Sequence, residues 1–184
     1  MESWNTYYTS HITTAEEAVR RIKSGDRVVI QHACGEPTFL VDAMVANAEA
    51  YRDVEIVHMV AMGQAAYARP GMERHFRHNA LFVGGTTRSA VAEGRADFTP
   101  CFFSEVPGLF RSALPVDVAM ISVTPPDENG KCSLGVSVDY TMAAVKCAKT
   151  VIAQVNANMP YTYGDAAIDV SEIDCFVPHD APII

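Results

Sequence analysis

The sequence predicts an α/β protein with a three-layer, open, mainly parallel sheet and helices on both faces. Short runs that are apolar throughout alternate with helical stretches along the chain. That alternation is typical of parallel strands buried on both faces. Most of the glycine and proline residues fall in the segments that follow the apolar runs. An open parallel sheet gathers its ligand-binding loops at that edge.

The first elements follow from capping and periodicity. A helix is expected between Thr14 and Gly25, because Thr14 stands three residues before a glutamate, the spacing of a capping box, and the glycine stands where a helix would stop. A strand is expected at 27–32. The next helix is expected at 38–51, with Thr38 available as its N-cap.

The same alternation continues through the rest of the chain. No internal repeat, low-complexity tract or long linker interrupts it, so residues 1–184 are expected to form a single domain. Strands are expected at 54–62, 80–84, 98–103, 117–123 and 150–156, and helices at 87–97, 106–114 and 137–150.

Composition excludes several classes of function. A formal net charge of −8 argues against nucleic acid or an anionic membrane surface as a partner. Apolar stretches are far shorter than the ~20 residues of a membrane span, and residues 1–18 show no secretory pattern, so a cytoplasmic protein is expected. The five cysteines form no CxxC pair and do not cluster with histidines, so neither a disulfide framework nor a metal site is expected.

Three loops after predicted strands are candidates for a ligand site. In 32–38 a glycine would let the backbone approach a ligand and the next helix would offer N–H groups to an anion. An ordinary turn with a solvated Glu36 explains that loop equally well, since the G-x-G-x-x-G fingerprint is absent. In 84–89, Thr86 or Thr87 is expected to cap a helix, and an anion at the same place would be compatible with that role.

The third loop, 62–78, carries the densest positive charge of the chain. Forked guanidinium groups could dock a phosphate or carboxylate there, but a solvated surface segment is favoured. Residues 62–64, directly at the strand end, are the better candidates for a pocket wall. The basic residues are Arg69, Arg74, His75, Arg77 and His78.

No catalytic residue can be assigned from motifs alone. Glu105 follows a predicted strand, where a carboxylate could act as nucleophile, but a helix-start role is favoured because no partner is visible. No G-x-S-x-G elbow, His-x-x-x-His or HExxH pattern is present.

The stretch VTPPDENGKCSLGVSVDYTM (123–142) resembles the family of acetyl-CoA hydrolases and CoA-transferases. Four other segments resemble consecutive parts of the same family in the same order, and the resemblance covers the chain from about Ile22 to Pro178. These segments are 24–49, 57–63, 82–110 and 151–165.

The resemblance implies an enzyme that moves coenzyme A from acetyl-CoA or butyryl-CoA to a hydroxy acid or another short-chain carboxylate. A glutamate would attack the thioester, giving an anhydride and then a glutamyl-CoA thioester, with backbone N–H groups stabilising the oxyanions. The acyl-CoA is a substrate, and no cofactor is implied. The resemblance also implies the fold that ribose-phosphate isomerases share, although the motifs here do not resemble theirs.

The chain departs from the family in one respect. Family members are about twice as long, with two similar α/β halves, and their glutamate nucleophile belongs to the second half. Neither Glu36 nor Glu105 matches its motif, so no catalytic residue is carried over. We expect this chain to be an N-terminal half that needs the C-terminal half of the same enzyme. A domain of a longer chain or a cleaved chain is favoured over a separate subunit.

The half present here is expected to enclose substrate and, through its exposed interdomain face, to form homo-oligomers. Acetyl-CoA hydrolysis is the alternative within the family, and a stand-alone CoA- or acid-binding domain is the alternative of another class. The expected pocket residues are Gly35, Glu36, Pro37, Met62, Gly63, Gln64, Ser137, Asp139, Tyr140 and Asn156. Met159 and Pro160 would close the same rim.

Overall fold

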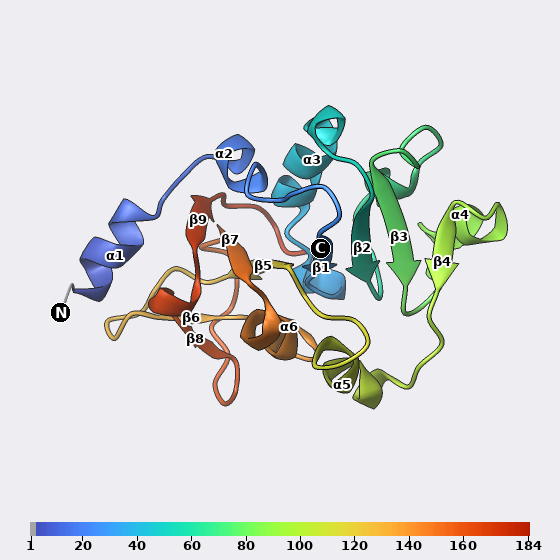
Figure 1. The fold of residues 1–184 in the computed structure, drawn as a ribbon. Coiled ribbons are helices and arrows are strands. Elements are labelled where there is room, and N and C mark those ends of the chain that lie inside the picture. The colour runs from blue at the N-terminus through green and yellow to red at the C-terminus, as the bar shows by residue number, and fades with distance from the viewer. Residues whose placement is uncertain (1–2) are drawn as a thin grey trace.

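The computed structural model describes residues 3–184, and its centre is an open parallel sheet. The strand order is β4-β3-β2-β1-β5-β7-β9, and every neighbouring pair is parallel (Figure 1). The strands are β1 (Arg27–Ile30), β2 (Val54–His58), β3 (Phe76–Ala80), β4 (Ala96–Phe98), β5 (Val118–Val123), β7 (Thr150–Val155) and β9 (Cys175–Pro178).

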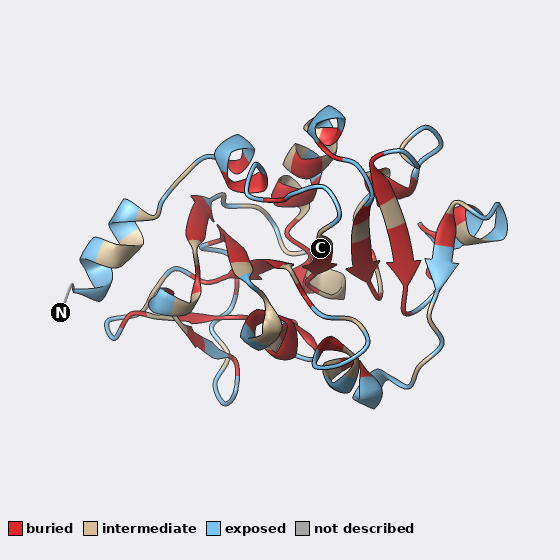
Figure 2. Cartoon of the chain, in the orientation of Figure 1, coloured by how far each residue is buried: buried red, intermediate tan, exposed pale blue. Residues whose placement is uncertain are grey.

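Helices cover both faces of this sheet, which confirms the three-layer prediction. On one face lie α2 (Ala15–Val19), α3 (Thr38–Ala46) and α4 (Arg88–Ala92), and on the other lie α5 (Val106–Phe110) and α6 (Thr141–Cys147) (Figure 1). Successive strand residues enter different hydrophobic clusters, because side chains alternate between the faces of a strand. Figure 2 shows the resulting continuous buried layer.

Smaller elements complete the fold. A short antiparallel pair, β6 with β8, lies beside the main sheet, and helix α1 precedes it in the chain. Single turns of 3-10 helix follow several strands and mark the loops described below. These elements are α1 (Trp4–Ser10), β6 (Lys131–Ser133), β8 (Ala167–Asp169), η1 (Ala33–Gly35), η2 (Ala48–Ala50), η3 (Ala66–Ala68), η4 (Phe103–Glu105) and η5 (Val170–Glu172).

Most central elements lie where the sequence predicts them, and two strand positions were wrong. The strand expected at 80–84 is β3, four residues earlier, and the strand expected at 98–103 is reduced to β4 at 96–98. Because of the basic residues in and around β3, this segment resembles a solvated surface stretch in the sequence. Its alternating Phe76, His78 and Ala80 are buried, so their burial in the sheet outweighs the polar composition.

Helix starts differ in detail from the prediction. The Thr14 hydroxyl accepts a hydrogen bond from the Glu17 amide at 3.2 Å, as the predicted cap requires. The Thr38 cap was wrong, because Pro37 occupies the N-cap position and Thr38 is the first helical residue. A proline has no N–H to leave unsatisfied at that position. Strands β6, β8 and β9 and helix α1 were not predicted.

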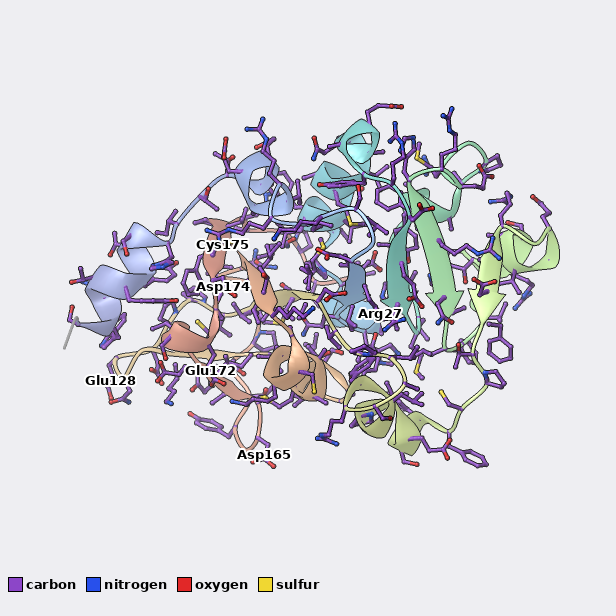
Figure 3. The ribbon with its side chains drawn as sticks, in the orientation of Figure 1. Arg27, Glu128, Asp165, Glu172, Asp174 and Cys175 are labelled. Carbon is purple, nitrogen blue, oxygen red and sulfur yellow. The ribbon has the colours of Figure 1, made fainter. Side chains whose placement is uncertain are left out.

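Charged side chains join the amino ends of the strands. Arg27, at the start of β1 (Figure 3), pairs with Glu55 on β2 at 2.6 Å, and its backbone amide donates to Asp117. Asp117 also accepts from Lys149, just before β7. This edge is therefore occupied by internal ion pairs.

Candidate active site

The loops that follow the strands of the main sheet form its carboxyl edge. Gln31, directly after β1, is buried and connects the end of β1 with β5 and with the 134–137 loop. Its amide nitrogen donates to the carbonyl oxygens of Leu134 (3.1 Å) and Ser137 (2.8 Å), and its amide oxygen accepts from the Ser122 amide (2.5 Å). A fully satisfied buried amide fixes its neighbours, so Gln31 holds the 134–137 loop against β1 and β5.

Gly35 is required by close packing in this region. A Cβ at this position would lie 2.8 Å from both the Gln31 side-chain nitrogen and the Ser137 Cβ. Any larger residue would therefore push the 33–35 turn away from the 134–137 loop. The glycine lets two loops that are far apart in the sequence approach each other.

A histidine and an aspartate meet where these loops join. The Nδ1 atom of His32 lies 3.2 Å from Oδ2 of Asp139, and the Ser137 hydroxyl donates to the same oxygen at 2.6 Å. A carboxylate can only accept, so Nδ1 carries the proton and a neutral His32 keeps its lone pair on Nε2. Burial alone would raise the pKa of Asp139. Hydrogen bonds from His32, Ser137 and the Thr141 amide outweigh this effect and hold that pKa below its usual value.

A hollow of about 360 Å³ opens beside this pair. Phe103, Ser104, Pro107, Asp139 and Tyr140 line it. The His32 ring lies against two of the lining residues, with ring centroids 5.3 Å from Phe103 and 5.5 Å from Tyr140. The arrangement is an apolar wall with one imidazole–carboxylate pair, which is the usual composition of a small-molecule site.

Tyr140 supports the hollow from behind. Its hydroxyl donates to the carbonyl oxygen of Ile30 at 2.8 Å and accepts from the Met59 amide at 3.4 Å. Burial raises the pKa of this phenol, so it stays protonated and donates its hydrogen bond. The ring therefore connects the end of β1 with the end of β2.

Glu36 is a buried carboxylate, and the solvated alternative considered for it was wrong. Its Oε2 accepts hydrogen bonds from the backbone amides of Met62 and Gly63, both at 2.8 Å. Burial raises the pKa of this carboxyl, the two amides oppose the rise without cancelling it, and the charge of Asp42 adds to it. Glu36 thus joins the loop after β1 to the loop after β2.

The remaining predicted residues occupy the same edge with different contacts. Pro37 is buried at the start of α3, and the exposed Gln64 accepts from Arg69 at 3.2 Å. Asn156 holds the C-terminal segment, since it donates to the Ala181 carbonyl and accepts from the Ala181 amide. The structure thus brings Gly35, Ser137, Asp139 and Tyr140 together and places Glu36, Met62 and Gly63 on the adjoining loops.

Part of the basic segment is not a solvated surface. His75 and His78 are buried, and Arg77 on β3 pairs with Asp97 on β4 at 2.5 Å, whereas Arg69 and Arg74 are exposed. Burial lowers the pKa of His78 to about 4. Burial, with the charges of His78 and His32, lowers that of His58 to about 3. Both imidazoles are neutral members of the core.

Two other predicted features have structural roles. The Glu105 carboxylate accepts from the Phe102 amide at 2.8 Å, which fits the favoured helix-start role. Thr87 occupies the N-cap position of α4, but its side chain makes no capping hydrogen bond. The Thr86 hydroxyl donates to the Ala61 carbonyl at 2.9 Å and so joins the loops after β2 and β3.

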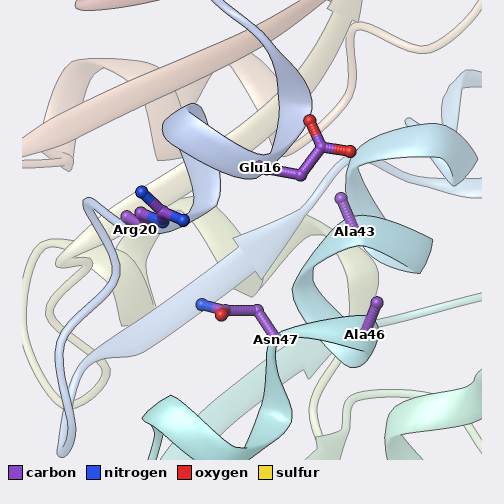
Figure 4. A pocket seen from close by; sticks show the side chains of 5 residues that line it. All are labelled: Glu16, Arg20, Ala43, Ala46 and Asn47. Carbon is purple, nitrogen blue, oxygen red and sulfur yellow. The ribbon is translucent and has the colours of Figure 1, made fainter.

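Another hollow lies away from the carboxyl edge. Glu16 and Arg20 from the α2 region and Ala43, Ala46 and Asn47 from α3 line about 160 Å³ between these helices (Figure 4). Its Arg20 pairs with Glu17 at 3.0 Å. It contains none of the predicted site residues, so the hollow beside His32 is the better candidate. Among residues 3–184, no helix is long and apolar enough to cross a membrane, and no cluster of side chains could hold a metal ion.

Gln31, His32 and Phe103 were not predicted as site residues. His32 immediately follows the apolar run of β1, and a polar side chain at that position is the signal that could have identified it. Gln31 and Phe103 look like ordinary core and surface residues in sequence. Their roles depend on contacts with residues about 70 to 106 positions away, as the Gln31–Ser137 bond illustrates.

A three-layer parallel sheet with a polar pair beside an apolar hollow at its carboxyl edge defines a ligand-binding α/β domain. Residues 1–184 match the acetyl-CoA hydrolase/transferase N-terminal domain, and the chain belongs to that family. It is 57% identical over 98% of its length to the 4-hydroxybutyrate coenzyme A transferase of Clostridium kluyveri, of which it covers 42%.

Solved structures agree with this assignment. A 4-hydroxybutyrate CoA-transferase from Porphyromonas gingivalis has 35% identity and a TM-score of 0.83, with 99% of this chain and 42% of that chain covered. RipA from Yersinia pestis has 28% identity and a TM-score of 0.94, with 100% and 45% covered. The chain therefore spans less than half the length of these relatives.

Proposed function

We propose that residues 1–184 form the substrate-enclosing N-terminal half of an enzyme that moves coenzyme A between short-chain carboxylates. Acetyl-CoA or butyryl-CoA would be the donor, and 4-hydroxybutyrate or a similar acid the acceptor. The observation that carries the proposal is the His32–Asp139 pair beside the hollow lined by Phe103 and Tyr140. The names of the similar proteins support the reaction class.

The apolar wall suits the methylene chain of a short acid, and the imidazole suits its polar end. When the N–H at Nδ1 donates to Asp139, a neutral His32 imidazole can accept a hydrogen bond at Nε2 from a hydroxyl group. A hydroxy acid carries such a group and an unsubstituted acid of equal length does not. Loss of a hydrogen bond to a half-buried acceptor is costly, so this contact would favour the hydroxy acid.

The nucleophile of the reaction is proposed to lie outside residues 1–184. A glutamate in the C-terminal half of the same enzyme would form the acyl anhydride and glutamyl-CoA thioester. Large apolar side chains are exposed along the carboxyl edge, where that half would pack. They are Met62, Phe82, Phe98, Phe102, Phe103 and Val136. The same surface would support a homo-oligomer.

The cytoplasm is the proposed compartment, since five free thiols suit a reducing environment.

The test measures products from acetyl-CoA or butyryl-CoA, with 4-hydroxybutyrate or butyrate as acceptor. The enzyme combines residues 1–184 with a polypeptide equivalent to the rest of the C. kluyveri relative. Formation of 4-hydroxybutyryl-CoA without free CoA is expected for a transferase. Free CoA that accumulates regardless of acceptor would identify a hydrolase. Tight CoA binding without turnover would identify a stand-alone binding domain.

A further inference from the structure

Glu36 and the backbone of 62–63 make an unusual contact. Two consecutive amides, those of Met62 and Gly63, point at the same carboxylate oxygen at 2.8 Å each. Consecutive N–H groups that converge in this way form a concave anion site. Here the carboxylate of Glu36, a residue that is 5% exposed, occupies that site from the interior of the protein. A buried charged acceptor is costly, so its retention needs a reason.

The backbone at Gly63 packs closely against Glu36. A Cβ at Gly63 would lie 2.7 Å from the Glu36 Oε1 and 3.2 Å from the Thr38 methyl group. The loop continues through Ala65, which has a positive φ of 43°, an unfavourable conformation for alanine. Contacts with other residues must hold such a backbone in place. Among these contacts, the hydrogen bonds from Met62 and Gly63 to the Glu36 carboxylate involve a charged group.

The conformation of this loop determines where Met62 lies. Met62 is 46% exposed on the carboxyl edge, although its backbone amide donates to the buried Glu36 carboxylate. A flexible thioether on a fixed backbone makes an adaptable apolar wall. If the amides of Met62 and Gly63 lost their acceptor, the wall would move while the His32–Asp139 pair stayed in place.

We propose that Glu36 is a positioning residue that fixes the 62–64 loop from below, so that the loop presents Met62 as the wall that selects the carboxylic acid substrate. This inference rests on the proposed function. Glu36 neither attacks nor transfers a proton in this account. It acts through the two amides, and its loss is expected to alter acid recognition more than turnover.

The first test observes the contact directly in the 184-residue chain. In ¹⁵N–¹H spectra, the Met62 and Gly63 amide protons should shift together as the Glu36 carboxyl titrates. Since burial raises the pKa of Glu36, their common midpoint should lie above that of an ordinary glutamate. Glu36→Gln keeps the size of the side chain and should abolish the titration of both amides. Titration that persists in this variant would overturn the contact.

The second test separates positioning from general stability. Glu36→Gln and Glu36→Ala are compared with Asp127→Asn, because Asp127 likewise accepts two backbone amides, those of Asn129 and Lys131, but in a turn away from the 62–64 loop. In the two-part enzyme, Glu36→Ala should raise KM for the acid about tenfold with kcat nearly unchanged. Glu36→Gln should recover part of the loss, because its amide oxygen still accepts. Asp127→Asn should leave KM as in the wild type.

The outcomes distinguish the two proposals. A wild-type enzyme without transferase activity contradicts the proposed function, whereas the amide titration still tests the contact. An active wild type with equal acid KM in all variants overturns the positioning role. An equal fall in kcat for the Glu36 and Asp127 variants also overturns it, because it would indicate lost stability alone.

Discussion

The imidazole of His32 and the carboxylate of Asp139 lie 3.2 Å apart, although 107 residues separate them in the sequence. One follows β1 and the other precedes α6, and neighbouring parallel strands bring both to the carboxyl edge. Gln31 and Gly35 hold the same two segments together. The His32–Asp139 pair therefore depends on a small, densely packed junction. This dependence leads to specific predictions.

Asp139→Asn should impair substrate recognition. The asparagine amide can present N–H to His32, which would favour the wrong imidazole tautomer and remove the negative charge beside the ring. We expect kcat/KM for the hydroxy acid to fall about tenfold or more in the two-part enzyme. Ser137→Ala is the matched control, since it removes a hydrogen bond to Asp139 and leaves the His32 contact. Equal effects of the two substitutions would contradict the role of the pair.

Gly35→Ala should destabilise the junction. The added methyl group would meet the Gln31 amide and the Ser137 Cβ at 2.8 Å, so one loop must shift, at a cost of about 1–3 kcal/mol. Urea unfolding measures this free energy. Gly108, within α5, has open space around its Cβ position, and alanine there should be neutral or stabilising by about 0.5–1 kcal/mol. The same loss at both positions would refute the packing argument.

Two of the buried histidines, His58 and His78, should make the protein sensitive to acid. Their pKa values are lowered to about 3 for His58 and about 4 for His78, whereas an unfolded histidine titrates near 6.5. The unfolded chain therefore binds more protons below pH ~6.5, so stability is full above that pH and falls as pH decreases toward 4. His58 faces His78, His32 and the Tyr67 hydroxyl, and none of these supplies a negative charge.

His78→Phe should remove its share of this acid sensitivity. The variant loses the hydrogen bond to the Ile56 carbonyl, which costs about 1 kcal/mol of stability at pH 7. Between pH 7 and 4.5, however, its free energy of unfolding should fall by about 2 kcal/mol less than that of the wild type. Urea unfolding at the two pH values gives the difference. Parallel curves for wild type and His78→Phe would show that His78 is not the source.

The sequence predicted the fold well and the site only in part. The apolar runs of β1, β5 and β7 are buried on both faces and were identifiable without tertiary context. Strand β3 was displaced in the prediction because His78 and Arg77 resemble a surface segment. The burial of His78 depends on the Tyr67 ring and on the neighbouring strand β2, which no local pattern reveals.

The sequence likewise predicted some features of the candidate site and missed others. Glycine and proline marked the loops, and position after a strand predicted Gly35, Glu36 and Gly63. The pattern could not show that Glu36 turns inward to two amides or that Asn156 holds the C-terminal segment. Those contacts join segments far apart in the chain, and the prediction that these residues line a substrate pocket still awaits experiment.

The most direct test of the account is CoA transfer from butyryl-CoA to 4-hydroxybutyrate, measured for three samples. These are the 184-residue chain alone, a polypeptide equivalent to the rest of the C. kluyveri relative alone, and the two mixed. We expect no transfer by either part and transfer by the mixture, strongly reduced when the mixture carries Asp139→Asn. Full transfer by the 184-residue chain alone, with its mass verified, would contradict it.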